Sequence, residues 1–549
     1  STGLHNLAVM CEQSRKQGIP IVLSGVLPNV ENVLLKAKFD ELLGRENICS
    51  HINLALERAK QIVLAAGRDL AQGKEETYFC SSVLKVWEPL IGLSCDGEII
   101  PKLAESWESR NEGKEWIFHL RKNVFFHDGE PFNSMAVLQN FNRYQNMGLR
   151  ATSYYYFTMD RIYPNFERIE ADDEYTVHLY FSQAEPLLPY RMVEWGSAMY
   201  SPQSFDLETG DFKEKIAGTG PFRLVEHEPD SYIILRRNDS YYGEKAKAET
   251  LKIVTMPSME TRYSALRSEE IMGVLDLGGI SPLMAKELLG TGLFNVSVQK
   301  STISHYLSIN GDKYPFNDER MVQSISMAID REKIVHYYFN DYAKPTINFL
   351  NSVTPFSVDY SVTYDKNVAI ELAHQVLGDR KVNVKFLLTR SGVERYPYKV
   401  IAEFLQAELR PLGLNIDIQM VDDLAASIMK QKGDYDMAIS IRGLDNLDPS
   451  WLVNDFFYSK GGTNTRNHFG YNNSDVDEIL LELRNAKTIE GKRFLFQRLQ
   501  EELIHHPAVV PLMEGKNVIV SNKRIQGYNA SIYGASVETV QWAESEKKQ

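Results

Sequence analysis

The chain has 549 residues, more than one hydrophobic core ordinarily serves, so we expect two or more domains. Hydrophobic residues make up 43% and charged residues 24%, which is typical of a globular protein. The net charge is −13 and no basic run occurs, which argues against a nucleic acid as a main partner. No apolar stretch approaches the roughly 20 residues that cross a bilayer. The opening residues, 1–3, show no basic and apolar leader, so we expect a mature or truncated chain.

The four cysteines all lie in the first 95 residues, at Cys11, Cys49, Cys80 and Cys95, and none forms a C-x-x-C pair. Cys80 and Cys95 could form a disulfide in an oxidising compartment. We expect two buried free thiols instead.

Residues 1–62 differ in pattern from the rest of the chain. Apolar residues at helical spacing predict helices over 3–17, 30–37 and 52–59, and the apolar run at 21–26 predicts a short buried strand. This order of elements predicts a small α/β unit with a parallel strand.

This unit resembles the C-terminal half of a STAS domain, the module of bacterial anti-sigma-factor antagonists and sulfate-transporter tails. Residues 1–3 match the end of its D-S-T-G loop, residues 23–26 its late strand, and residues 46–48 the approach to its last helix. The resemblance implies that Ser1 and Thr2 are candidate phosphorylation positions. The loop Asp and the earlier strands are absent, so we expect a leftover or fused fragment without regulatory activity.

The stretch 103–132 has the most informative pattern in the chain. Alternation of Trp116, Phe118 and Leu120 with other residues predicts a strand buried mainly on one face. The Asn and Gly residues of 111–113 tolerate the positive φ of a tight turn, and Asn133 is placed to cap a following helix.

In order, this stretch reads A-x-S-W, G-K-x-W-x-F-x-L-R and V-x-F-H-D-G-x-P-F. It closely resembles the signature of the family 5 extracytoplasmic solute-binding proteins, the peptide- and nickel-binding components of ABC importers. The resemblance extends over about 63–549. It includes the E-P-L element near residue 88, the G-T-G-P-F turn at 218–222, the R-N-x-x-Y-Y-G loop at 237–243 and the A-I-D-R helix end at 328–331.

Beyond residue 380, strands and helices alternate. Alternating apolar residues predict strands over 382–386, 416–420 and 437–441, and helical spacing predicts helices over 398–409 and 476–483. Such alternation predicts a mostly parallel sheet with a ligand-facing rim.

The resemblance implies an α/β, two-lobed periplasmic-binding-protein-like fold of class II, the large peptide-binding type, preceded by the small STAS-like fragment. We expect the STAS-like part at 1–62, lobe I at 63–300 completed by about 513–549, and lobe II at 301–512. The resemblance also implies that the lobes close on the ligand by a hinge.

The loop at 442–449 follows a buried strand, which predicts a position on the ligand-facing rim. In dipeptide- and oligopeptide-binding relatives the matching loop reads x-D-x-x-D-P, and its first Asp pairs with the peptide α-ammonium. That residue is Asp445 here, and a carboxylate shielded from water is a strong partner for an ammonium group. We expect Asp448 to cap the following turn. Arg442, Asn446 and Trp451 are further ligand-binding candidates in this region.

Four other candidates come from segments that border the cleft in relatives. Arg68 follows the first strand and would either meet a ligand carboxylate or form a surface ion pair. Tyr78, Phe79 and Trp195 would contribute aromatic walls, with core packing as the alternative for each. We assign Trp87 and Trp107 to the core.

Nickel-binding relatives carry a Trp and no equivalent Asp at this loop, and they hold the carboxylates of a chelator with arginines. Arg143 and Arg191 lie in roughly the right regions, but neither matches the pattern. A short peptide or another amine-bearing solute is therefore our first ligand hypothesis, and a nickel chelate is the second.

An enzyme is the rival class. The twelve histidines show no metal-ligand spacing, and neither a G-x-S-x-G elbow nor a dinucleotide fingerprint occurs. The turn at 218–222 lacks the spacing of a phosphate-binding loop, Asp422 and Asp423 look like a helix cap, and His505 and His506 look structural or superficial. We expect no catalysis, no cofactor and no bound metal of the protein's own.

We expect a monomer on the periplasmic or outer side of the cell envelope that delivers its ligand to an ABC permease in the membrane. The alternative from a different class is a cytoplasmic solute-sensing regulator acting through the STAS-like part. A complete upstream STAS half would favour that alternative.

Overall fold

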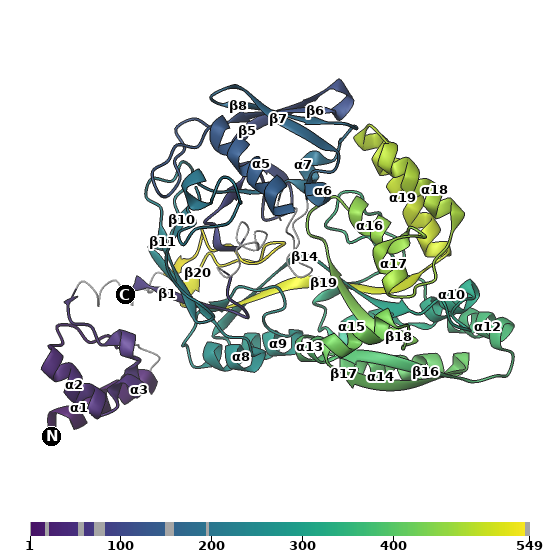
Figure 1. Ribbon diagram of the computed structural model, residues 1–549. Helices are drawn as coiled ribbons and strands as arrows, with labels where there is room; N and C mark the ends of the chain where they lie inside the picture. Colours follow the sequence, from purple (N-terminus) through teal and green to yellow (C-terminus); the bar gives the residue numbers. More distant parts are fainter. Residues whose placement is uncertain are drawn as a thin grey trace, which may run out of the picture.

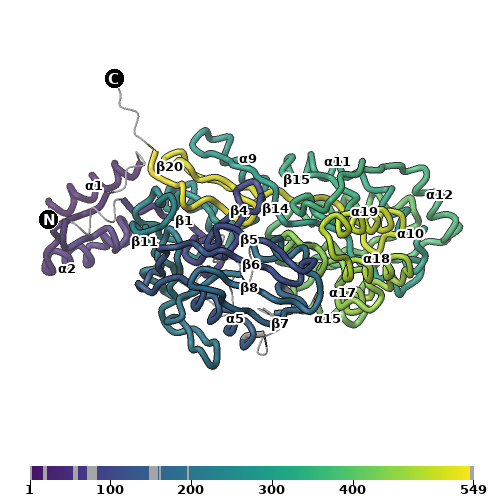
Figure 2. Tube along the Cα trace, turned by 90° about the horizontal axis from the view of Figure 1, so that it is seen from above, coloured from purple at the N-terminus to yellow at the C-terminus, as the bar shows by residue number. Residues whose placement is uncertain are grey.

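The computed structural model describes residues 2–16, 21–52, 60–70, 83–148, 159–193 and 197–543 (Figure 1). The main body surrounds one long sheet, and the N-terminal helices form a small group beside it. Figure 2 shows this group at the opposite end of the molecule from α18 (Ser474–Asn485) and α19 (Ile489–His505). None of the described helices is both long and apolar enough to cross a bilayer.

The N-terminal unit packs three short helices around a core that includes Cys11, Leu34 and Phe39. Its elements are α1 (Thr2–Lys16), α2 (Pro28–Lys36), α3 (Phe39–Leu43) and a 3-10 turn, Arg45–Asn47. The strand expected over 21–26 is reduced to one parallel bridge, between Leu23 and Ile48. The expected third helix, over 52–59, lies almost wholly outside the described residues.

Eleven described strands form the long sheet. Ten follow one path, in the order β10 (Phe222–Glu228), β11 (Tyr232–Arg237), β12 (Thr250–Thr255), β1 (Ile62–Ala66), β13 (Gly273–Val274), β19 (Val509–Asn522), β14 (Phe294–Ile309), β18 (Met437–Gly443), β16 (Val382–Thr389) and β17 (Leu414–Val421). β15 (Ala343–Pro345) pairs with β19 from the side.

β14 and β19 run antiparallel through the middle of this sheet and belong to both halves of the body. Their pairing shifts register between Lys300 and Ser304, close to the lobe boundary expected at residue 300. The sheet is parallel at β16–β17 and β16–β18 but antiparallel at β14–β18, so it is mixed. Parallel pairs also occur at β1–β12 and β1–β13. A parallel pair needs a crossover connection, and between β16 and β17 that connection is helical.

Helices cover the half of the sheet that holds β16–β18, and its core contains Ile325, Phe386 and Leu405, among others. The helices of this half are α10 (Glu319–Ala328), α11 (Arg331–Lys333), a π turn (Ile334–Tyr338), α12 (Lys366–Leu377), α13 (Arg390–Arg395), α14 (Tyr398–Leu409), a 3-10 turn (Arg410–Leu412), α15 (Asp423–Gln431), α16 (Ser450–Phe457), α17 (Gly462–Arg466), α18 and α19. As expected, Asp422 caps α15, its side chain accepting a hydrogen bond from Ala425 N at 2.8 Å.

The first half of the body is the part that holds β10–β13. A second, four-stranded sheet stands above this half in Figure 1, in the order β5 (Ala104–Arg110), β6 (Glu115–Leu120), β8 (Thr176–Phe181) and β7 (Phe166–Asp173). The predicted turn is present: Asn111, Glu112 and Gly113 all have positive φ. α5 (Ser134–Gly148) follows, with Asn133 Oδ1 accepting from Ala136 N at 3.1 Å. The signature stretch therefore folds as predicted from local pattern.

Short elements complete the first half. They are β2 (Glu88–Pro89), β3 (Ile91–Leu93), β4 (Ile99–Pro101), α6 (Met159–Ile162), α7 (Leu188–Arg191), β9 (Ala198–Met199), a 3-10 turn (Pro202–Ser204), α8 (Met259–Arg267), α9 (Pro282–Gly290), β20 (Ile525–Gln526) and β21 (Gln541–Trp542).

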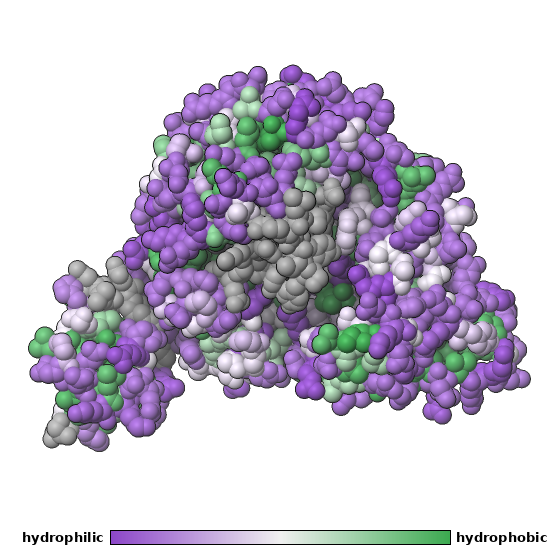
Figure 3. Space-filling model, viewed as in Figure 1, coloured by the Kyte–Doolittle hydropathy of each residue, from purple (hydrophilic) through white to green (hydrophobic). Residues whose placement is uncertain are grey.

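Two assignments from the sequence need correction or refinement. Trp87 is buried in the core, but Trp107 is only partly buried and packs against the edge of a core. Cys95 is exposed, which corrects the expectation of a buried thiol, and Cys80 lies outside the described residues. The face seen in Figure 3 is mostly hydrophilic, with apolar side chains gathered near α15, where Met420 and Leu424 are exposed.

Candidate functional site

A cavity of about 200 Å³ lies where β18 ends. Its walls come from three separate parts of the chain: residues 164–191, residues 442–454 and residues 480–492. Arg442, Asp445, Asn446 and Trp451, four of the predicted ligand-binding residues, are among its lining residues. The loop that was predicted to stand at a ligand-facing rim therefore borders a cavity, and ligand binding by these residues stays a prediction.

Local hydrogen bonds shape the loop between β18 and α16. Asn446 Oδ1 accepts from Asp448 N at 2.9 Å, and Asp448 Oδ1 accepts from Ser450 N at 2.9 Å. Asp448 thus caps the turn before α16, as predicted. Asn446 and Asp448 are buried, while Asp445 is half-buried on the cavity wall.

Asp448 also belongs to a buried ionic cluster that joins two distant segments. Arg191 donates through Nη1 to Asp448 Oδ2 at 3.1 Å and through Nη2 to Glu185 Oε2. Asn165 Nδ2 donates to the other oxygen of Glu185 at 2.7 Å. Because both carboxylates are used by one guanidinium, the cluster fixes residues 185–191 against the loop that carries Asp445.

Lys492 forms part of the same wall from α19. Its ammonium donates to the carbonyl of Leu483, and its side chain is buried. Burial lowers the pKa of Lys492, and the neighbouring Asp448 opposes that effect. Lys492 is therefore held within the wall by a backbone partner.

Three polar atoms of cavity-lining residues are buried without a hydrogen-bond partner among the described residues: Arg191 Nε, Arg442 Nε and Ser450 Oγ. All three can donate. A buried donor left unpaired costs about 1–3 kcal/mol, so this group of donors indicates that an acceptor belongs in the cavity.

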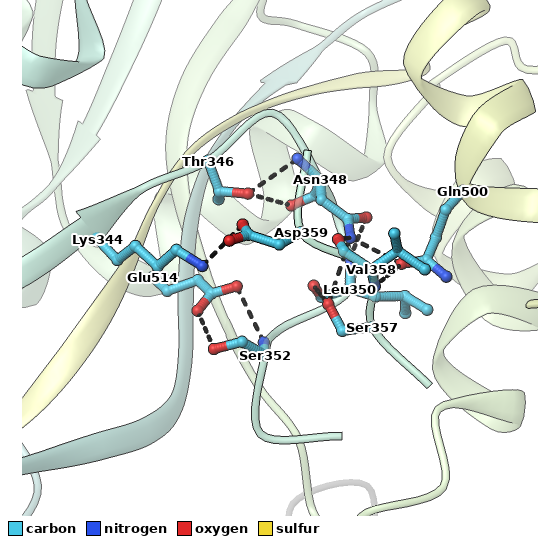
Figure 4. Close-up of polar contacts among 10 residues, drawn as sticks. All are labelled: Lys344, Thr346, Asn348, Leu350, Ser352, Ser357, Val358, Asp359, Gln500 and Glu514. Atoms are coloured by element: carbon cyan, nitrogen blue, oxygen red, sulfur yellow. Dashed lines mark hydrogen bonds and ion pairs between the residues drawn. The ribbon is translucent and has the colours of Figure 1, made fainter. Parts of the chain in front are cut away.

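A loop at 346–358 is held by several polar contacts (Figure 4). Glu514 of β19 accepts from Ser352 N at 2.9 Å and from Ser352 Oγ at 2.5 Å. Asn348 Nδ2 donates to Gln500 Oε1 at 2.7 Å. Thr354 Oγ1 in turn donates to Leu447 O at 2.7 Å. The loop thereby links the central strand β19 to the loop that carries Asp445.

Of the other predicted site residues, Arg68 is described by the structure and does not line this cavity. Arg68 lies beside the buried Asp276: burial raises the pKa of that carboxyl, and the charge of Arg68 is among the influences that lower it. Its contact with a ligand stays a prediction. Tyr78, Phe79 and Trp195 lie outside the described residues.

The two arginines considered for a chelator have other partners. Arg143 is buried, donates through Nε to Gly210 O at 2.9 Å and stacks 3.8 Å from the ring centre of Phe212. Arg191 is bound to two carboxylates, as described above. These contacts do not favour an arginine pocket for a chelate at either position.

Sequence reasoning missed Glu185, Ser450 and Lys492 and gave Arg191 another role. Ser450 follows Pro449 directly, so the loop motif at 442–449 could have pointed to it. Glu185 and Lys492 carry no local signal, because Glu185 lies far from the loop at 442–454 in the sequence and Lys492 reaches that loop from a separate helix, α19.

Comparisons with known proteins concern the family and the fold of the chain. Residues 98–464 match the model for bacterial extracellular solute-binding proteins, family 5, middle region. The probable D,D-dipeptide-binding periplasmic protein DdpA of Escherichia coli is 26% identical over 438 residues, which cover 78% of this chain and 81% of that protein.

Two solved structures show the same fold. NikA from Brucella suis, in complex with Fe(III)-EDTA, has a TM-score of 0.76 at 19% identity and covers 88% of this chain and 100% of its own. The periplasmic binding protein DppA from Helicobacter pylori, in complex with a peptide, has a TM-score of 0.68 at 22% identity and covers 89% and 99%. These likenesses confirm the two-lobed binding-protein fold.

Proposed function

The chain belongs to the family 5 bacterial extracellular solute-binding proteins, and we propose that it binds a short peptide or another amine-bearing solute in the cavity beside Asp445. The observation that carries this proposal is the position of Asp445 on the cavity wall at the end of β18. A half-buried carboxylate there suits an ammonium group, since a charge-assisted hydrogen bond is stronger away from water. The name of the Escherichia coli relative, a dipeptide-binding protein, supports the same ligand class.

We propose further that the protein takes part in transport. The protein captures its solute outside the cytoplasm as a monomer, closes around it by bending near the register shift of β14 and β19, and delivers it to an ABC permease. Family membership and the periplasmic relatives support this role, and it requires no catalysis. None of the described residues of the N-terminal unit lines the cavity.

The test is isothermal titration of the full chain with the dipeptide Ala-Ala and with N-acetyl-Ala-Ala. We expect Asp445→Asn to weaken Ala-Ala binding about 10- to 100-fold, equivalent to about 1.5–3 kcal/mol for a hydrogen bond to a charged group. The acetylated peptide, which lacks the ammonium, should bind as weakly to the unchanged protein. Asp379→Asn, at an exposed carboxylate, is the matched control. Equal binding of Ala-Ala to the Asp445→Asn variant and to the unchanged protein would contradict the assignment of Asp445.

A further inference from the structure

We propose that the cavity also binds a carboxylate of the solute, carried by the same residue as the ammonium, and that Arg442 is the residue that selects it. The preferred ligand is then a peptide whose first residue is acidic. This inference rests on the proposed function and deepens it.

The unpaired donors favour an anionic group. Arg191 Nε, Arg442 Nε and Ser450 Oγ are all buried without a partner, and all belong to lining residues of the one cavity. Arg191 is 7% exposed, and its other two nitrogens are already bonded to Glu185 and Asp448. A carboxylate offers two oxygens with about four acceptor positions, which is the group best suited to several converging N–H and O–H donors.

Arg442 differs from Arg191 in its charge balance. No carboxylate of the described residues forms an ion pair with Arg442. Its guanidinium stacks over the ring of Trp451, 5.5 Å from the ring centre. Stacking uses the face of the guanidinium and leaves the N–H groups at its edge for hydrogen bonding. Arg442 therefore lines the cavity with its plane held by an aromatic ring and without an ion-pair partner among the described residues.

The spacing of Arg442 and Asp445 limits where the ligand's charges lie. Three residues of chain separate their Cα atoms by at most about 11 Å, and both side chains line the same small cavity. Each further residue of an extended peptide moves its C-terminal carboxylate about 3.3 Å farther from its ammonium. A carboxylate on the first side chain stays beside the ammonium whatever the length of the peptide. The cavity therefore matches an acidic first residue better than it matches a distant C-terminus.

The test is a thermodynamic cycle in which the charge of the ligand and the residue at position 442 are both varied. The affinities are measured by isothermal titration of the full chain. The ligands are Glu-Ala and Gln-Ala, which have nearly the same shape and differ by one charge. The proteins are the unchanged chain, Arg442→Gln, and Arg498→Gln, a control at an exposed ion pair with Glu482. We expect the unchanged chain and Arg498→Gln to prefer Glu-Ala at least tenfold, and Arg442→Gln to lose that preference. Arg442→Lys, which keeps the charge, should retain part of it, so a folding defect in Arg442→Gln does not remove the test.

A second pair of ligands, Ala-Ala and Ala-Ala amide, shows whether Arg442 binds the C-terminal carboxylate instead, because the amide lacks that group. If Arg442 binds the first side chain, Arg442→Gln leaves the ratio of these two affinities unchanged. A change in that ratio, with no change in the Glu-Ala to Gln-Ala ratio, places the C-terminus at Arg442 and overturns the proposal. Equal binding of Glu-Ala and Gln-Ala by the unchanged chain also overturns it, while leaving peptide binding intact. If no dipeptide binds, the proposed function fails together with this inference.

Discussion

Asp448→Asn tests whether the buried ionic cluster stabilises the protein. Asp448 is 7% exposed, receives Arg191 Nη1 at 3.1 Å and caps Ser450 N at 2.9 Å. Loss of one partner from a buried ion pair costs about 3–5 kcal/mol, because the other charge stays buried. Glu185 still pairs with Arg191, so we expect a loss at the lower end of this range. The free energy of unfolding should fall by about 3 kcal/mol, which raises the unfolding equilibrium constant roughly a hundredfold.

The assay is urea unfolding followed by tryptophan fluorescence. Asp359→Asn is the matched control, because Asp359 also pairs with a cation, Lys344 at 2.9 Å, but its side chain is 80% exposed. An exposed pair of this kind contributes about 0–1 kcal/mol. A loss below about 1 kcal/mol in Asp448→Asn, similar to that in the control, would refute the view that the cluster holds the loop in place.

Two further predictions concern stability. A Cβ at Gly218 would lie 2.1 Å from Val86 O, so Gly218→Ala should lower the free energy of urea unfolding by about 1–3 kcal/mol. Gly290→Ala, at a helix end with open space around it, should leave that energy unchanged or raise it by up to about 1 kcal/mol, and equal effects of the two changes would contradict the packing argument. Burial lowers the pKa of His305 to about 3. The unfolded chain, with a histidine pKa near 6.5, therefore binds a proton that the folded chain does not bind between these values. The free energy of unfolding should fall by up to about 1.4 kcal/mol per unit as the pH drops below about 6.5, and His305→Gln should flatten that slope, measured by urea unfolding at pH 7, 6 and 5. An unchanged slope would show that His305 is not the cause.

Local patterns predicted much of the fold correctly. The turn at 111–113, the helix cap at Asn133 and the strands β16–β18 each depend on a few neighbouring residues, whose φ preference or alternation is visible in the sequence. The strand expected at 21–26 formed only in part: the segment has one bridge, at Leu23, and one further backbone hydrogen bond, from Val26 N to Cys49 O.

The loop of the candidate site was also predictable, because Asp445 and Asp448 stand in a short motif after a buried strand. The rest of its environment was not. Arg191 and Asp448 are 257 positions apart, and no local periodicity reports such a contact. The role proposed for Arg442 rests on its lack of an ion-pair partner among the described residues, and the sequence gives no sign of that.

By itself, the sequence determined the turn at 111–113, the alternation of strands and helices beyond residue 380, the family signature and the rim loop with its carboxylate, because each of these depends on residues close together in the chain. Tertiary structure alone decided that β14 and β19 join the two halves through one sheet, and that Glu185, Arg191 and Lys492 enclose the loop. The physical reason is that charge compensation and burial are properties of neighbours in space. A sequence shows which charges exist, and only the fold shows which of them remain unpaired.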